Sequence, residues 1–371
     1  MLTQLHRSHP PSRMQSHPQG DVRLEQSDAT DATCAVNPSA QRLSSTRKRL
    51  LGVDFAKGVL VLVMVLYHWM NYFVGFDSGA YKYLRFLTPS FIFLAGFLIA
   101  YVYQPRFNAG DNRIPVRLVW RGLKLLAIVL VLNATMQFAV AGHSIDPRWW
   151  QAPWERLWSY STGSAPLSFS ILVPIGYLLI ASAGLLVVAR RMPALLHVIT
   201  GALIAISFWC EWARVPNGYL EIFSMGMLGV SAGYLPIEAI HRVVSHRMTV
   251  LAVYAAYLWA LTVWNAIYLL QIVGVCLNLA ILYAGAGIPP SGHGVSGLLI
   301  RLGEYSLFGY IAQIAILQIL HRLAPALGES GGTPALLLLI ALAATGLSVS
   351  ILDWVRPRVP AINRIYTAVF A

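Results

Sequence analysis

Two ionisable residues, Lys57 and His68, lie in one apolar segment of the kind that is typical of a membrane-spanning helix. Charged and titratable groups are costly inside a bilayer, so each is a hypothesis for a functional site. The two positions are eleven residues apart, which is close to three turns of an α-helix. Both side chains therefore share one face, about 16 Å apart along the helix axis. A cation near the helix start and an imidazole deeper in the span could hold the two ends of one long ligand.

The imidazole is the group in this segment that could perform proton chemistry. Histidine is the usual general base for a hydroxyl proton because its ordinary pKa lies near neutral pH. Of the ten histidines, only His68 lies deep inside a predicted span, and the others lie in the N-terminal tail, in loops or at helix ends. Asn71 follows His68 by three residues and is predicted to orient its ring. The alternative is a structural histidine that hydrogen-bonds a neighbouring helix.

A stripe of basic residues follows further along the chain. Arg113, Arg117, Arg121 and Lys124 recur at intervals of four, four and three residues, which places them along one side of a helix start. Guanidinium groups bind phosphate through two parallel hydrogen bonds, so this stripe is predicted to bind an anionic ligand. The alternative is that these cations only anchor the helix at the cytoplasmic surface. Arg121 is the preferred ligand residue because it lies deepest.

Three further sites contain polar residues in or beside predicted spans. Asp54 precedes Lys57 by three residues, so it could neutralise that cation or contact the ligand. Arg301 and Glu304 are also three apart, and they form either an intramembrane ion pair or a contact to the ligand. Gln313 lies in the same late span as that pair. Amides inside spans commonly hydrogen-bond between helices, and contact with a substrate is the alternative.

The composition predicts the elements that position these residues. Hydrophobic residues make up 57% of the 371 residues and charged residues only 11%, whereas soluble proteins contain about 25% charged residues. We therefore expect an all-α, polytopic membrane domain over residues 47–371. Its apolar runs are long enough for ten transmembrane helices. These are predicted near 57–75, 83–103, 117–140, 168–189, 193–210, 219–238, 248–264, 266–287, 298–320 and 334–353.

The net charge of +12 is interpreted as a topology signal. The basic residues cluster in alternate loops, and cytoplasmic loops carry the excess of Lys and Arg in membrane proteins. This pattern places both termini in the cytoplasm, predicts attraction to anionic membrane lipid and argues against a nucleic-acid partner. The three cysteines show no metal-ligand spacing, so no metal is predicted. Residues 1–46 are rich in Ser, Gln, Arg, His and Pro and are predicted to be a disordered cytoplasmic tail.

The segment around Lys57 resembles a known family. Arg49, Asp54, Lys57, Gly58 and His68 stand in the order R-x4-D-x2-K-G-x9-H, which is similar to the first helix of the acyltransferase-3 superfamily of membrane acyltransferases. A second segment, LGEYSLFGYIAQIAILQ, begins at residue 302 and is similar to the family's late helix. Gln313 stands there where the family often has a histidine. The resemblance covers residues 49–355, and the segment TPSFIFLAGFL is closest to the glucan-succinyltransferase-like branch.

The resemblance implies an O-acyltransferase of the bacterial inner membrane. It would move an acetyl or succinyl group from acyl-CoA, bound as a donor substrate and not as a permanent cofactor, to a hydroxyl of an envelope glycan or lipid-linked sugar. His68 and Lys57 are then the expected catalytic residues, and further residues are expected to contact the donor and the acceptor substrate. The donor contacts are Arg117, Arg121, Lys124 and Arg301. The substrate contacts are Asp54, Asn71, Glu304 and Gln313. The alternative function is a transporter or flippase for a glycan or small solute. The acceptor and the oligomeric state stay open.

Overall fold

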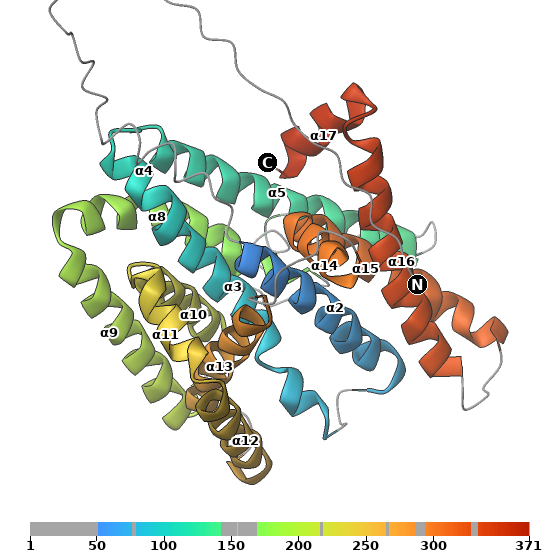
Figure 1. Ribbon diagram of the computed structural model, residues 1–371. Coiled ribbons are helices and arrows are strands. Elements are labelled where there is room, and N and C mark those ends of the chain that lie inside the picture. The colour runs from blue at the N-terminus through green and yellow to red at the C-terminus, as the bar shows by residue number, and fades with distance from the viewer. Residues whose placement is uncertain are drawn as a thin grey trace, which may run out of the picture. The chain divides into compact units, whose positions relative to one another are not determined.

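The computed structural model describes residues 51–75, 79–141, 154, 169–215, 218–264, 267–286, 294–327 and 333–370. The predicted disordered tail lies outside these residues, so that prediction and the boundary at residue 47 stay untested. Every regular element in the described ranges is a helix, which confirms the all-α prediction (Figure 1).

The described helices extend from the start of α2 to the end of α17. The first half contains α2 (Leu51–Phe73), α3 (Leu87–Leu98), α4 (Gln104–Asn108), α5 (Ile114–Ala141), α8 (Leu172–Arg191) and α9 (Pro193–Trp212). The second half contains α10 (Gly218–Ala232), α11 (Ile237–Ser245), α12 (Arg247–Trp264), α13 (Tyr268–Ala286), α14 (Val295–Glu304), α15 (Ser306–Leu323), α16 (Thr333–Val355) and α17 (Pro360–Phe370). A 3-10 turn (Tyr81–Leu84) precedes α3, a π-helical turn (Ile99–Tyr103) joins α3 to α4, and a second 3-10 turn (Ala324–Leu327) follows α15.

Each of the ten predicted spans coincides with helix, but the count of ten continuous spans is not confirmed. Among the described residues, seven helices are long and apolar enough to cross a membrane, or eight if one bent pair counts as a span. That pair replaces the predicted span 219–238, because α10 and α11 meet at 102° where Pro236, which cannot continue a helix, precedes α11. The predicted span 298–320 is also divided, because Tyr305 separates α14 from α15.

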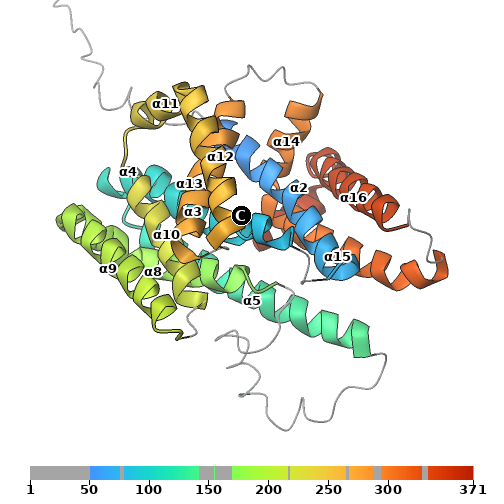
Figure 2. The ribbon, with the colours of Figure 1, turned by 90° about the horizontal axis from the view of Figure 1, so that it is seen from below.

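Helix α2, which carries Lys57 and His68, lies in the middle of the bundle. It packs against α3, α13, α14, α15 and α16, as both ribbon views show (Figures 1 and 2). One side of its middle turns is enclosed, with Leu60, Val61, Met64 and Val65 at most 1% exposed, while the residues between them are partly exposed. A polar side chain on the enclosed side of α2 therefore faces protein or an internal cavity, and not lipid.

A close crossing between α2 and α14 joins the two motif segments. A Cβ atom on Gly58 would overlap the carbonyl oxygen of Leu299, and one on Gly303 would overlap the carbonyl oxygen of Asp54. The two backbones are thus in direct contact, as small residues permit between membrane helices. The crossing brings Lys57, beside Gly58, next to the late motif, although the two are far apart in sequence.

Helix α15 runs parallel to α2 beyond this crossing. Val61 lies against Gly309, Val65 belongs to the same buried cluster as Leu317, and Gln318 donates a hydrogen bond of 3.1 Å to the hydroxyl of Tyr72. Positions on the two helices therefore rise together. The stretch of α2 that contains His68 lies beside the middle of α15, where Gln313 is located.

Candidate active site

His68 lies between two tyrosine rings in a buried position. Its ring centroid is 5.2 Å from that of Tyr67 and 6.2 Å from that of Tyr310 on α15. Its Nε2 atom is buried and has no hydrogen-bond partner among the described residues. A purely structural histidine would be expected to hydrogen-bond a neighbouring helix, because an unpaired buried polar atom is costly. The unpaired nitrogen instead favours a site that a ligand or water completes.

Two amide side chains near His68 also have buried polar atoms without a hydrogen-bond partner among the described residues. The side-chain oxygen of Asn71 and both polar side-chain atoms of Gln313 are buried without a partner in the described part of the chain. Gln313 is fully enclosed and follows Tyr310, which contacts His68, by three residues on α15. The structure thus brings three predicted site residues to one depth of the bundle. Together they provide an unpaired nitrogen, an amide donor and amide acceptors for a bound molecule.

A cavity of about 310 Å³ brings the predicted cations together. Lys57 of α2 and Arg121 and Lys124 of α5 line it, and Tyr310 forms part of its wall. The rest of the wall is mainly apolar and comes from α3, α5, α8 and α15, with Phe370 of α17 contributing as well. No acidic side chain from the described residues lines this cationic cavity. An elongated ligand with a negatively charged end would match it in charge.

Asp54 holds the Lys57 side chain. The Lys57 Nζ atom is 2.8 Å from Asp54 Oδ1, and these side chains are only 19% and 11% exposed. Asp54 is not part of the cavity wall, whereas Lys57 is. The arrangement fits a positioning role for the carboxylate, and the predicted contact between Asp54 and substrate stays a prediction.

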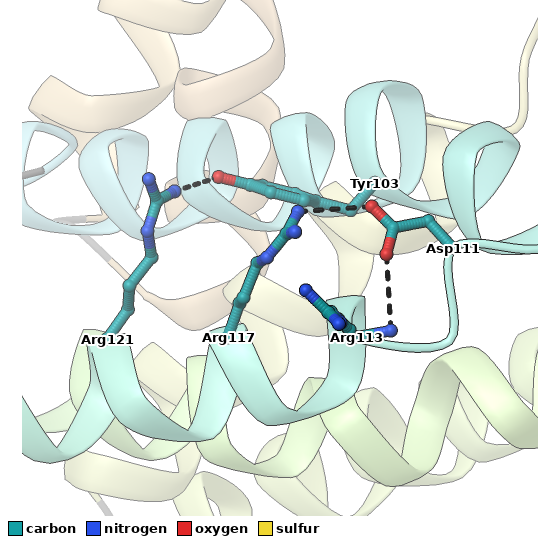
Figure 3. A network of polar contacts seen from close by, with 5 residues as sticks. All are labelled: Tyr103, Asp111, Arg113, Arg117 and Arg121. Atoms are coloured by element: carbon teal, nitrogen blue, oxygen red, sulfur yellow. Dashed lines mark hydrogen bonds and ion pairs between the residues drawn. The ribbon is translucent and has the colours of Figure 1, made fainter.

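The basic stripe of α5 divides between two partners, as Figure 3 shows. Arg121 donates to the hydroxyl of Tyr103 in the π-helical turn, and its guanidinium lies 5.7 Å from the Tyr103 ring centroid. Arg117 instead forms an ion pair of 3.1 Å with Asp111, and its side chain is 53% exposed. The carboxylate of Asp111 also accepts the backbone N–H of Arg113. Only Arg121 and Lys124 of the stripe reach the cationic cavity.

Arg301 and Glu304 lie in the last turn of α14, on either side of Gly303 in the sequence. Arg301 Nε is 3.6 Å from Asp353 on α16, and Asp353 also accepts a hydrogen bond of 3.0 Å from the Tyr305 hydroxyl. Neither Arg301 nor Glu304 lines the cationic cavity. The roles in ligand binding predicted for these two residues stay predictions.

A second cavity, of about 610 Å³, opens beside Tyr67 and was not expected from the sequence. Its wall is mixed but contains many polar side chains, so we call it the polar cavity, and the Tyr67 hydroxyl hydrogen-bonds the hydroxyl of Tyr81 there. The charged and amide side chains of this polar cavity are Lys82, Arg85, Glu221 and Gln271. One signal was overlooked: Glu221 is an acidic residue inside a predicted span, which is itself a mark of a functional site.

His68 therefore lies where two cavities of different character approach each other. Tyr310 lines the cationic cavity and Tyr67 lines the polar cavity, and both rings neighbour the imidazole. His68 itself lines neither cavity, but Lys57 of the cationic cavity lies near the start of α2 and Tyr67 of the polar cavity lies near its end, so the two cavities are on opposite sides of His68 along the helix. An anionic molecule from one side and a polar molecule from the other could meet at the imidazole.

A comparison with models of known protein families gives a match over most of the chain. A family model described as an acyltransferase domain, acyltransferase-3, matches residues 50–353, which includes both motif segments except Arg49 and both cavities except the α17 residues. No curated protein is similar enough to the chain to count as a match. The similarity to one branch of the family stays a prediction.

Proposed function

Because the chain belongs to the acyltransferase-3 family of membrane acyltransferases, we propose that it transfers an acetyl or succinyl group from acyl-CoA to a hydroxyl of an envelope glycan or lipid-linked sugar. Its family and its apolar helices make it a multi-pass membrane acyltransferase, which sets aside the transporter alternative. The observation that carries the proposal is the position of His68 between a cationic cavity and a polar one.

The cationic cavity is proposed to hold the donor. Coenzyme A carries its phosphates at one end and the thioester at the other, so it needs cations and a catalytic group that are well separated. Lys57, Arg121 and Lys124 supply the cations, and the apolar wall between them and Tyr310 suits the uncharged arm. The axial separation of about 16 Å between Lys57 and His68 leaves room for that arm.

His68 is proposed to act as the general base. Its Nε2 takes the proton of the acceptor hydroxyl while the oxygen attacks the thioester carbonyl carbon, which forms a tetrahedral oxyanion. Collapse of this intermediate breaks the carbon–sulfur bond, and the imidazolium returns its proton to the leaving thiolate. The unpaired Nε2 donor of Gln313 is suited to stabilise the oxyanion, while Asn71 orients the ring or the acceptor. Direct transfer needs no acyl-histidine, although a covalent variant would use the same nitrogen.

The polar cavity is proposed to receive the acceptor. Its hydroxyl, amide, cationic and acidic groups can donate and accept hydrogen bonds with a sugar. The positive-inside pattern places the start of α2 in the cytoplasm, where acyl-CoA is made, and so places the polar cavity toward the outer side. The chain would then work in the bacterial inner membrane and acylate a glycan on the outer side with a cytoplasmic donor.

Removal of the Lys57 charge should weaken donor binding. We expect Lys57→Met to raise the KM for acyl-CoA about 10-fold to 100-fold, which is the effect of losing one hydrogen bond to a charged group. The variant also removes the Lys57 ammonium from beside the Asp54 carboxylate, so Asp54→Asn with Lys57→Met is the matched control for folding. Size-exclusion chromatography should show that the double variant is assembled like the wild type, and steady-state kinetics should show that its KM for acyl-CoA is still raised. A donor KM equal to the wild-type value would remove Lys57 from the donor site.

Removal of the Arg85 charge should affect the acceptor alone. We expect Arg85→Gln to raise the acceptor KM about tenfold and to leave the KM for acyl-CoA unchanged, because Arg85 lines the polar cavity and not the cationic one. The Lys57 variant should show the opposite pattern. Kinetics in which both variants shift the same constant would contradict the assignment of one substrate to each cavity.

The proposed activity is tested by mass spectrometry of envelope glycans. Glycans from a deletion strain are compared after complementation with the wild-type chain or with His68→Ala. We expect an ester-linked mass of acetyl or succinyl that is present only with the wild type, and that mass identifies the acyl group and the acceptor together. An acylation pattern that is the same in all strains would contradict acyl transfer to a glycan.

A further inference from the structure

A third cavity lies away from His68, between α2, α3, α11 and α13. It measures about 330 Å³, and its wall is almost entirely apolar. Val53 and Ala56 of α2 and Phe97 of α3 form one side, while Ile240 of α11 and Leu279 of α13 belong to the other. We call it the apolar cavity. Its volume and its almost entirely apolar wall suit a hydrocarbon chain.

A smaller pocket of about 280 Å³ adjoins the apolar cavity and contains basic and hydroxyl side chains. His241, Ser245 and Arg247 line this basic pocket, and Val244 and Tyr283 line both it and the apolar cavity. The hydroxyl of Tyr283 lies 3.2 Å from Nε2 of His241, so the tyrosine and histidine form one polar wall. Because two side chains are shared, one amphiphilic molecule can occupy both spaces.

The order of the two spaces along the helices matches a lipid in a bilayer. The basic pocket contacts Gly52 at the start of α2 and Ala284 near the end of α13. The apolar cavity lies deeper, further from these two helix ends, at Ala56 of α2 and at Cys276 of α13. Cys276 and Tyr283 are seven residues apart, which is about 10 Å along the helix axis. A molecule with its charged group among the helix ends and its chain about 10 Å deeper has the orientation of a phospholipid.

Helix α11 covers both spaces in the manner of an interfacial helix. It turns by 102° from α10, and Ile237, Ile240 and Val244 face the apolar cavity. His241 and Ser245 face the basic pocket, and Arg242 is exposed. A short amphipathic helix with basic residues on its polar face is typical of a helix that lies at the membrane surface and contacts anionic lipid.

We propose that α2, α11 and α13 form a binding site for one anionic phospholipid. Its phosphate binds Arg247 and His241 in the basic pocket, and one acyl chain fills the apolar cavity. Leu94 of α3 lines both this apolar cavity and the cationic cavity, so the bound chain supports a wall of the proposed donor site. The lipid site itself rests on the two adjoining spaces and does not depend on the donor assignment.

The test uses Cys276 as a reporter, because its thiol lines the apolar cavity and is exposed. In a background with Cys34→Ser and Cys210→Ser, the rate at which N-ethylmaleimide modifies Cys276 is measured in detergent with added phosphatidylglycerol or phosphatidylcholine. We expect phosphatidylglycerol to slow the modification at about tenfold lower concentration than phosphatidylcholine, because the choline cation of phosphatidylcholine offsets its phosphate charge and is repelled by Arg247.

Two arginine variants separate the site from general charge effects. Arg247→Gln should abolish the preference for phosphatidylglycerol, whereas Arg113→Gln, which removes an exposed arginine that lines neither space, should retain it. Ala280→Phe should fill the apolar cavity. When this change is made in the chain with its three natural cysteines, native mass spectrometry should show that one retained phosphatidylglycerol is lost. Equal protection by both lipids in the parent protein, or a retained preference in Arg247→Gln, would overturn the proposal. Size-exclusion chromatography confirms that each variant is assembled.

Discussion

Purified His68→Ala is expected to lose about 10²-fold to 10⁴-fold in acyl-transfer turnover, the usual contribution of a general base. The KM for acyl-CoA should stay near the wild-type value, because the cations that line the donor cavity are unchanged. The reason is local: His68 Nε2 is the unpaired basic atom between the two cavities, and alanine supplies no group to take the hydroxyl proton. The measurement is release of free CoA thiol in the presence of the glycan acceptor.

His321→Ala is the matched control for this variant. His321 also packs against aromatic rings of α2, with centroids 5.5 Å from both Tyr72 and Phe73, but it is exposed, whereas the Nε2 atom of His68 is buried and unpaired among the described residues. We expect this variant to keep its turnover. If His68→Ala kept wild-type turnover, or if both histidine variants lost activity equally, the assignment of His68 as the base would be wrong.

Gly303→Leu is expected to prevent stable assembly of the protein. A side chain at Gly303 would overlap the carbonyl oxygen of Asp54, which belongs to the backbone of α2 and cannot rotate away. Overpacking within a core costs about 1–3 kcal/mol, and the cost is larger where a backbone must move. The crossing that carries Lys57 and the late motif should therefore separate. Detergent-purified protein should show a lowered Tm, or elute as an aggregate in size-exclusion chromatography.

Gly346→Ala serves as the control for a small-to-large change in a buried helix. A Cβ atom at Gly346 on α16 would lie 3.8 Å from Leu298, which is an ordinary van der Waals contact. We expect that variant to elute as a single species with a Tm near that of the wild type. A Gly303→Leu protein that matched it in both measurements would show that α2 and α14 do not depend on their close contact.

The sequence was sufficient to find α2 and its two ionisable residues, because an ionisable residue in an apolar segment is visible without a structure. The spacing of Lys57 and His68 placed them on one helix face, and the i,i+3 spacing placed Asp54 beside Lys57, where the 2.8 Å ion pair is found. The all-helical class followed equally directly from hydropathy. The sequence suggested Glu304 as the ion-pair partner of Arg301 and did not predict Asp353, which lies 3.6 Å from Arg301 in the structure. Asp353 belongs to α16, and the local sequence around Arg301 does not show which distant helix packs beside it.

The polar cavity and the broken spans show where local reasoning ends. Tyr67 belongs to α2, Arg85 to the turn before α3 and Gln271 to α13, and only the packed bundle brings them to one wall. The turn between α10 and α11 follows from Pro236, which a hydropathy window averages away. Helix α17 was not expected because its eleven residues are too few to cross a membrane, although Phe370 reaches the cationic cavity.

The most direct test of the central claim, that two substrates reach His68 from opposite ends of α2, uses proteoliposomes. The purified protein is reconstituted with the glycan identified by mass spectrometry sealed inside the vesicles, and acyl-CoA, which does not cross the bilayer, is added outside. The account predicts that the sealed glycan is acylated by the wild-type chain and not by His68→Ala. Acylation only when glycan and acyl-CoA share the same side of the membrane would contradict it.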